Sequence, residues 1–221
     1  MFSRIGKLPF LMASALVFSV AGCGDDSGTP VGVDDTRECL RSSDCPCVGD
    51  CLVSAHARAL ETLDASAYAD LLAVPGDHGP LDAGFRFHVR PGDEADFPWL
   101  VQPWWSRAVE LGMMRNAFDP SFSGESPVQF ISVEFTILNK VSTTDSFGVP
   151  VSETTVDMII DFRTAPESGY QIDTRLVFVT GFDTGRVDRI RAIREISKPE
   201  PGRASPTSWG LVKSLYRGGT P

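Results

Sequence analysis

The pattern of apolar and polar positions divides the chain into a helical part and a strand-rich part. Apolar residues recur three or four positions apart over 51–63, 65–72 and 104–118, which predicts three amphipathic helices. A short alternating run at 85–89 predicts one half-buried strand between the second and third helices. The rest of the chain is β-rich, with strands expected at 128–140, 153–163, 170–182 and 186–196.

Polar and turn residues stand where these elements should begin and end. Asp50 is placed to cap the first helix, and either Asp64 or Ser66 can cap the second, which 75–76 (Pro-Gly) should stop. Ser208 can cap a last helical turn after a Pro-rich linker. Short turns between the long strands indicate antiparallel neighbours. The sequence therefore predicts an α+β domain with helices on one face of a curved sheet.

Alternation along three of the long strands separates an apolar face from a charged one. The apolar faces carry no ionisable side chain, and they consist of Ile131, Val133, Phe135 and Ile137, then Val156, Met158, Ile160 and Phe162, then Ile172, Thr174, Leu176, Phe178 and Thr180. The opposite faces carry Glu134, Asp157, Asp161 and Asp173, with Arg175 placed to pair across strands. We expect the interior of the sheet to be apolar and to offer no group able to move a proton.

The segment 57–72, ARALETLDASAYADLL, resembles the opening helices of the NTF2-like (SnoaL-like) superfamily. A strand with phenylalanines, a helical region with tryptophans and a long-stranded meander follow it, so the resemblance covers 50–197. It implies a cone with an apolar pocket, in a superfamily of isomerases, cyclases, dehydratases and non-catalytic binding domains. The candidate lining residues of that pocket are Tyr68, Phe87, Trp104, Phe135, Met158, Phe162, Leu176 and Phe178.

Candidates for catalysis are few, and we assign no catalytic residue. The resemblance implies that a steroid isomerase of the superfamily would carry its catalytic base, an aspartate directly before a proline, at the end of the first strand. The corresponding residue in this chain is Arg90, before Pro91, which cannot act as that base. Tyr68 is expected to be a core tyrosine, and an enzyme would use Tyr68, His78 or a loop acid such as Asp93 or Asp96. The candidates in loops are His78, Asp93 and Asp96. The two other histidines, His56 in the first helix and His88 in the short strand, are expected to point to solvent. The chain has no H-E-x-x-H, no G-x-S-x-G and no phosphate-cradling glycine loop.

The first 22 residues are typical of a bacterial lipoprotein signal peptide. Arg4 and Lys7 precede an apolar run of about 15 residues, shorter than the roughly 20 that span a bilayer as a helix. Small residues then lead directly to Cys23, where we expect cleavage and acylation, with an uncleaved anchor or a plain secretory signal as alternatives. Residues 23–38 read as a flexible acidic tether. These features predict a protein of the bacterial cell envelope, attached to the inner or the outer membrane through acylated Cys23.

The four remaining cysteines, Cys39, Cys45, Cys47 and Cys51, lie together in a cluster at 39–51. An even number of cysteines in an exported chain predicts disulfides, and four cysteines allow three pairings. Cys45 with Cys47 is the least favoured pair, since so short a ring strains the bond. Zinc is the alternative, but the spacing lacks the paired C-x2-C of structural zinc sites. We therefore predict no metal and no cofactor.

Charge limits the partners. The formal net charge is −9, and removal of Arg4 and Lys7 with the signal makes it −11, which disfavours nucleic acid. A homodimer through the outer face of the sheet is a further expectation, because Val177 and Val179 add apolar area there. We predict a lipid-anchored, non-catalytic NTF2-like domain at 50–197 that binds an apolar small molecule or a protein partner, followed at 198–221 by the linker and helical turn. The alternative is an NTF2-like enzyme of the dehydratase, cyclase or isomerase type.

Overall fold

The structure is a computed structural model, and it describes residues 48–77, 83–145, 148–165, 168–181, 189–198 and 207–218. The expected signal peptide, the acidic tether and Cys23, Cys39, Cys45 and Cys47 lie outside the described residues, as do His78 and the Pro-rich linker. Cys51 is described, in the first helix. The disulfide prediction stays a prediction. Within the described residues, no helix is long and apolar enough to cross a bilayer.

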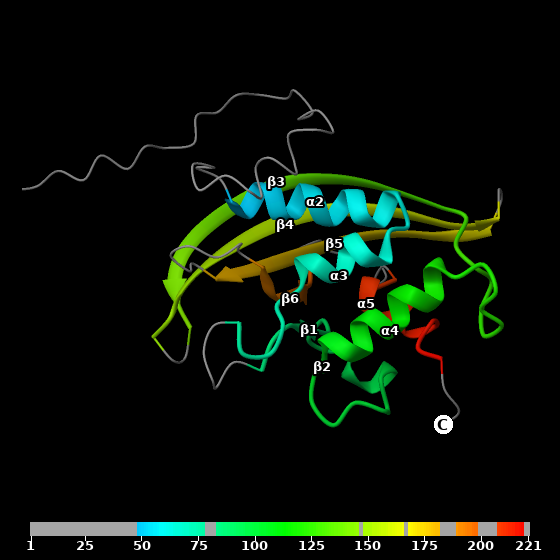
Figure 1. The fold of residues 1–221 in the computed structure, drawn as a ribbon, viewed down its shortest axis with the longest axis horizontal. Helices are drawn as coiled ribbons and strands as arrows, with labels where there is room; N and C mark the ends of the chain where they lie inside the picture. The colour runs from blue at the N-terminus through cyan, green and yellow to red at the C-terminus, as the bar shows by residue number, and fades with distance from the viewer. Residues whose placement is uncertain are drawn as a thin grey trace, which may run out of the picture.

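Four helices and six strands make up the described fold (Figure 1). The helical elements are α2 (Val48–Glu61), α3 (Ala65–Leu71), the 3-10 turn η1 (Glu94–Asp96), α4 (Arg107–Phe118) and α5 (Trp209–Ser214). The strands are β1 (Arg86–His88), β2 (Trp104–Ser106), β3 (Phe130–Thr144), β4 (Pro150–Ala165), β5 (Ser168–Gly181) and β6 (Ile190–Ile196).

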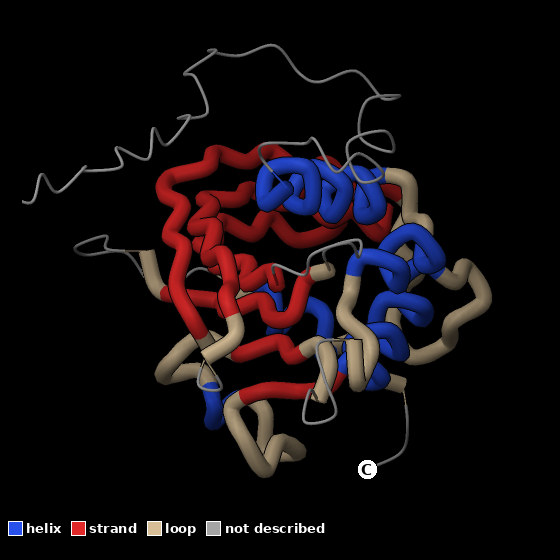
Figure 2. The backbone as a smooth tube through the Cα atoms, turned by 60° about the vertical axis from the view of Figure 1, so that its left-hand side comes forward, coloured by secondary structure: helices blue, strands red, loops and turns tan. Residues whose placement is uncertain are grey.

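All six strands form one sheet in the order β2-β1-β6-β5-β4-β3. Strands β3 to β6 are the predicted antiparallel meander, and β1 then pairs parallel to β6 and antiparallel to β2. The long strands curve, and the helices gather on one face of the sheet (Figure 2). The predicted α+β class, with N-terminal helices on a curved and mostly antiparallel sheet, is confirmed.

Local capping explains where two helices begin. Asp64 caps α3 as predicted, since its carboxylate accepts hydrogen bonds from the backbone N–H groups of Ser66 and Ala67, both at 2.9 Å. Leu63 has a φ of 52°, in the left-handed region that ends a helix, and it separates α2 from α3. Ser208 caps α5, because its hydroxyl accepts from the Leu211 N–H at 3.0 Å. Helix α2 begins at Val48, so Asp50 lies inside it and not at its cap.

One predicted helix boundary is wrong. The expected helix 104–118 starts as a strand, because Trp104–Ser106 pairs with β1 and only Arg107 onward is helical. The helical spacing of Ala108, Leu111, Met114 and Phe118 predicts that these four face the core; Leu111 and Met114 are buried, but Ala108 is exposed. Glu110, Met113 and Ala117 are buried as well. The spacing 110, 113, 114, 117 is as helical as the one used for the prediction. Periodicity alone cannot choose between two stripes that differ by a fraction of a turn.

The strand faces were predicted correctly. Val156, Met158, Ile160 and Phe162 of β4 are at most 1% exposed and belong to one hydrophobic core with Ile172, Leu176 and Phe178 of β5. Asp157, on the other face, receives two hydrogen bonds from the Arg175 guanidinium, at 2.6 and 2.9 Å. Val177 and Val179 are only 8% and 6% exposed, so they add little apolar area to the outer face.

Candidate functional site

A buried carboxylate lies at the centre of the concave side. Glu110 comes from α4 and is 0% exposed. Its Oε1 accepts from the Tyr68 hydroxyl at 2.5 Å, and its Oε2 accepts from Trp105 Nε1 at 2.6 Å. Lys213 Nζ donates to both carboxylate oxygens, at 2.8 and 3.0 Å. Four elements of the chain (α3, β2, α4 and α5) therefore meet at one carboxylate.

Lys213 is as enclosed as its partner. It reaches inward from α5, is 1% exposed, and its ammonium lies 3.3 Å from the ring centroid of Phe87. Burial lowers the pKa of Lys213, and the ion pair with Glu110 opposes that shift. Burial and the neighbouring Glu110 carboxylate raise the pKa of Tyr68 well above its ordinary value, so the phenol keeps its proton and acts as a donor. The arrangement is an ion pair held by two neutral donors.

His56 extends this cluster toward the long strands. Its ring lies 5.2 Å from the ring of Tyr68 and 5.2 Å from that of Phe178, measured between centroids. The side chain is 0% exposed, and among the residues that the structure describes neither ring nitrogen has a hydrogen-bond partner. Burial, and then the charge of Lys213, lower the pKa of His56 to about 3, so the imidazole is neutral.

The prediction that His56 faces solvent is wrong. Leu52, His56 and Leu60 follow one another at intervals of four along α2, so they share the face that packs on the sheet. The apolar stripe around His56 was the available signal. His88 in β1 is half-buried and lies on the outer face, as expected.

A second buried carboxylate holds the start of α5. Glu195 of β6 is 1% exposed and accepts from the Thr174 hydroxyl at 2.8 Å. It also accepts from the backbone N–H groups of Trp209 and Gly210, at 2.9 and 3.0 Å. These are unpaired amides of a helix N-terminus, where a negative charge is favourable. Helix α5, the helical turn expected beyond the linker, thus packs inside the fold.

The expectation of an apolar interior holds for the three strands on which it was based but not for the rest of the interior. The apolar faces of β3, β4 and β5 supply none, as predicted, but α2, α4, α5 and β6 supply His56, Glu110, Lys213 and Glu195. Glu110, Lys213 and Glu195 were missed because the argument from strand alternation covers only β3, β4 and β5, whereas His56 was considered and placed on the wrong face of its helix. The interior is apolar in its sheet wall and polar where the helices meet.

The predicted lining residues fall into three groups. Tyr68, Phe87, Met158, Phe162, Leu176 and Phe178 are buried in the core, at most 1% exposed. Phe135 is partly buried and packs against that core. Trp104 lies on the other face of the sheet from its buried neighbour Trp105, with the Arg86 guanidinium over its ring.

The loop acids considered for catalysis have other surroundings. Asp93 accepts from Arg90 Nε at 2.9 Å, and the two side chains form an ion pair of 2.8 Å. Asp96 is exposed. In the described part of the chain, no three His, Cys, Asp or Glu side chains are grouped to hold a metal ion.

No protein-family model and no curated protein sequence matches this chain. Among solved structures, a protein of the NTF2-like family from Streptomyces avermitilis is 17% identical, with a TM-score of 0.41 over 69% of this chain and 94% of that one. A Mycobacterium tuberculosis protein of unknown function is 12% identical, with a TM-score of 0.44 over 83% and 88%. A chain of naphthalene 1,2-dioxygenase is 13% identical, with a TM-score of 0.46 over 76% and 89%. At these values the similarity is remote and says nothing of activity.

Proposed function

We propose that this chain is an exported lipoprotein, anchored to a membrane of the bacterial cell envelope through acylated Cys23, whose NTF2-like domain binds a protein partner and does not catalyse a reaction. The N-terminal sequence supports the proposed export and lipid anchor, because it has a basic start, a short apolar run and small residues before Cys23. The packing of the domain interior supports the non-catalytic role.

The observation that carries the proposal is that both carboxylate oxygens of Glu110 are already occupied by hydrogen-bond donors of the chain itself. A general acid or base must reach a substrate atom within hydrogen-bond distance. Both oxygens of Glu110 already accept hydrogen bonds from Tyr68, Trp105 and Lys213, and Glu110 and Tyr68 are 0% exposed. The chain's own atoms therefore enclose the acid, and a substrate would have to displace at least one of its donors.

The same packing favours a protein partner over an apolar small molecule. Trp209, Val212 and Tyr216 of the α5 region are 0% exposed and fill the concave side together with Phe162, whose ring lies 5.9 Å from that of Trp209 and 5.6 Å from that of Tyr216. An apolar guest would compete with these side chains for the same space. The outer surface of the domain is open to a partner.

Metabolic labelling with an alkyne-bearing palmitate tests whether Cys23 is acylated and anchors the protein to a membrane. We expect label on the full chain and a membrane-bound product, and we expect Cys23→Ser to lose both. Cys39→Ser is the matched control and should keep the label. An unlabelled parent, or a labelled Cys23→Ser, contradicts the lipid anchor.

Native mass spectrometry and site-specific photo-crosslinking test the domain. We expect the purified full chain to carry no small-molecule adduct. A photo-crosslinking residue placed at Val101, which is 98% exposed, or at Phe130, which is 54% exposed, should give a discrete protein adduct in cells. A co-purified apolar ligand, or the absence of adducts from both positions, would overturn this part of the proposal.

A further inference from the structure

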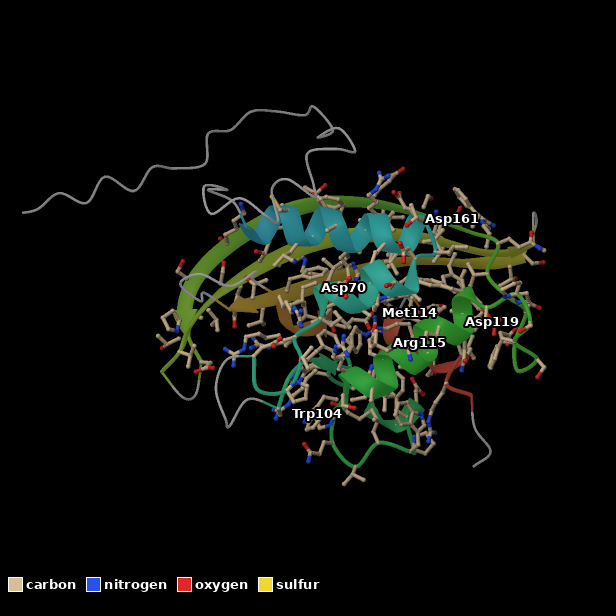
Figure 3. The ribbon with its side chains drawn as sticks, viewed as in Figure 1. Asp70, Trp104, Met114, Arg115, Asp119 and Asp161 are labelled. Carbon is tan, nitrogen blue, oxygen red and sulfur yellow. The ribbon has the colours of Figure 1, made fainter. Side chains whose placement is uncertain are left out.

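The outer face of the sheet carries a compact basic cluster where β1, β2 and β6 meet. Residues paired across neighbouring strands project on the same face. His88 of β1 is paired with Trp104 of β2 and with Arg194 of β6, and Arg86 lies two positions before His88 on the same face. Trp104 and Asp161 lie well apart in the view of Figure 3. Arg194 connects this cluster to the long strands, because it forms an ion pair with Glu153 of β4.

Arg86 is oriented by an aromatic ring and not by an acid. Its guanidinium carbon lies 4.5 Å from the ring centroid of Trp104, which is within the range of a cation–π contact. Among the residues that the structure describes, no carboxylate forms an ion pair with Arg86. A guanidinium that contacts an aromatic ring can still donate its N–H groups to a planar or tetrahedral anion.

The neighbouring groups make this place electropositive. Arg194 Nη1 forms one ion pair, with Glu153 at 2.9 Å, and 43% of its side chain is exposed. Burial, then Arg194 and then Arg86 lower the pKa of His88 to about 4. The two guanidinium groups thus repel a further positive charge at His88. The neutral imidazole still has one N–H to donate.

We propose that Arg86, His88 and Arg194 form a binding site for a small tetrahedral oxyanion, a sulfate or phosphate group, on the outer face of the sheet. The anion would accept charge-assisted hydrogen bonds from the two guanidinium groups and one hydrogen bond from the imidazole. Its charge opposes the repulsion that the two arginines exert on each other. The phosphate can be free or part of a phospholipid head group, since both present the same oxygens. This site does not depend on the proposed function.

Histidine NMR with sulfate as the probe tests the site directly. The full chain is titrated with acid in sodium sulfate and in sodium chloride of equal ionic strength, and the ring signals of His88 are followed. An anion within hydrogen-bond reach raises a histidine pKa by about one unit or more. We expect the pKa of His88 to rise from about 4 in sulfate only.

Two variants with opposite effects keep the test independent of folding. Arg86→Gln should weaken sulfate binding about tenfold, the loss expected for a charged hydrogen bond. Glu153→Gln releases Arg194 from its ion pair and should strengthen binding several-fold. Arg163→Gln, in an ion pair with Asp161 on the same face, is the matched control and should bind as the parent does.

Co-sedimentation with vesicles separates the two sources of phosphate. Arg86-dependent binding to phosphatidylcholine vesicles that contain phosphatidylglycerol assigns a head group to the site, and sulfate binding without vesicle binding assigns a free anion. The proposal is overturned if His88 titrates identically in sulfate and chloride and vesicles bind equally to the parent and Arg86→Gln. It is also overturned if sulfate acts but Arg86→Gln and Glu153→Gln change nothing.

Discussion

Lys213 and Glu110 form an enclosed ion pair although 103 positions separate them in the chain, with Nζ 2.8 and 3.0 Å from the two carboxylate oxygens. Neither side chain is more than 1% exposed. The pair ties the C-terminal helix α5 to α4, on the concave side of the sheet. Breaking it should therefore affect the whole domain.

Removing one partner of this pair should be far more costly than removing both. Lys213→Met leaves the Glu110 carboxylate buried without its counter-charge, and we expect a loss of about 3–5 kcal/mol in the free energy of unfolding. Glu110→Gln in the Lys213→Met background should recover part of that loss, because no uncompensated charge remains. Urea unfolding of the parent, both single variants and the double variant measures the coupling.

The exposed ion pair Arg163–Asp161 provides the control, since 37% and 26% of its side chains are exposed. Arg163→Gln should cost less than about 1 kcal/mol. Equal costs for Lys213→Met and Arg163→Gln would show that the buried pair does not hold the domain together.

The N-terminus of α5 should depend on a carboxylate from a distant strand. Glu195→Gln keeps the size of the side chain but removes the charge that Trp209 and Gly210 N–H groups face, and its loss should cost about 1–3 kcal/mol. Ser208→Ala removes only the local cap and should cost about 1 kcal/mol. Thermal unfolding by circular dichroism compares the two. A smaller effect for Glu195→Gln than for Ser208→Ala contradicts the anchoring role.

His56 should make the domain sensitive to acid. The unfolded chain takes up a proton on His56 near its ordinary pKa of 6.5, whereas the folded chain does so only at about 3. Protonation therefore favours the unfolded state, and the contribution of His56 to stability, complete above pH 6.5, is lost as the pH falls toward 3. Each pH unit in this window costs up to about 1.4 kcal/mol.

His56→Phe should flatten that dependence. Phenylalanine keeps a ring between Tyr68 and Phe178 and cannot be protonated, so the slope of unfolding free energy against pH between 4 and 6.5 should decrease. The slope is informative even if the larger ring lowers stability at every pH. His88→Phe is the comparison: its half-buried imidazole should contribute in the same direction but less. An unchanged slope in His56→Phe would contradict a neutral buried imidazole.

The cysteine cluster gives a prediction at the N-terminus of the domain. Cys51 lies in the first turn of α2, so a disulfide from it would fix the incoming chain to that helix. Alkylation of the denatured, unreduced protein, followed by mass spectrometry, should modify none of Cys39, Cys45, Cys47 and Cys51, and all four after reduction. Modification before reduction would contradict the disulfide prediction, and one modified pair would leave a single bridge.

The sequence alone determined the features that depend on local spacing. A strand repeats every two residues, so the faces of β3, β4 and β5 could be assigned without knowing their neighbours. Asp157 and Met158, for example, were correctly assigned to opposite faces of the sheet. The Asp64 and Ser208 caps also act within three residues of their partners. These short-range interactions fixed the α+β class and the outer position of the acids.

Only the tertiary structure decided the contents of the interior. Helical spacing allows several adjacent stripes, and which one is buried depends on the partner that covers it, as Glu110 shows. Lys213 is a surface residue by composition and becomes a core residue only because α5 turns back between α4 and the sheet. Burial of a charge is decided by the distant group that compensates it, and no local pattern in this sequence contains that information.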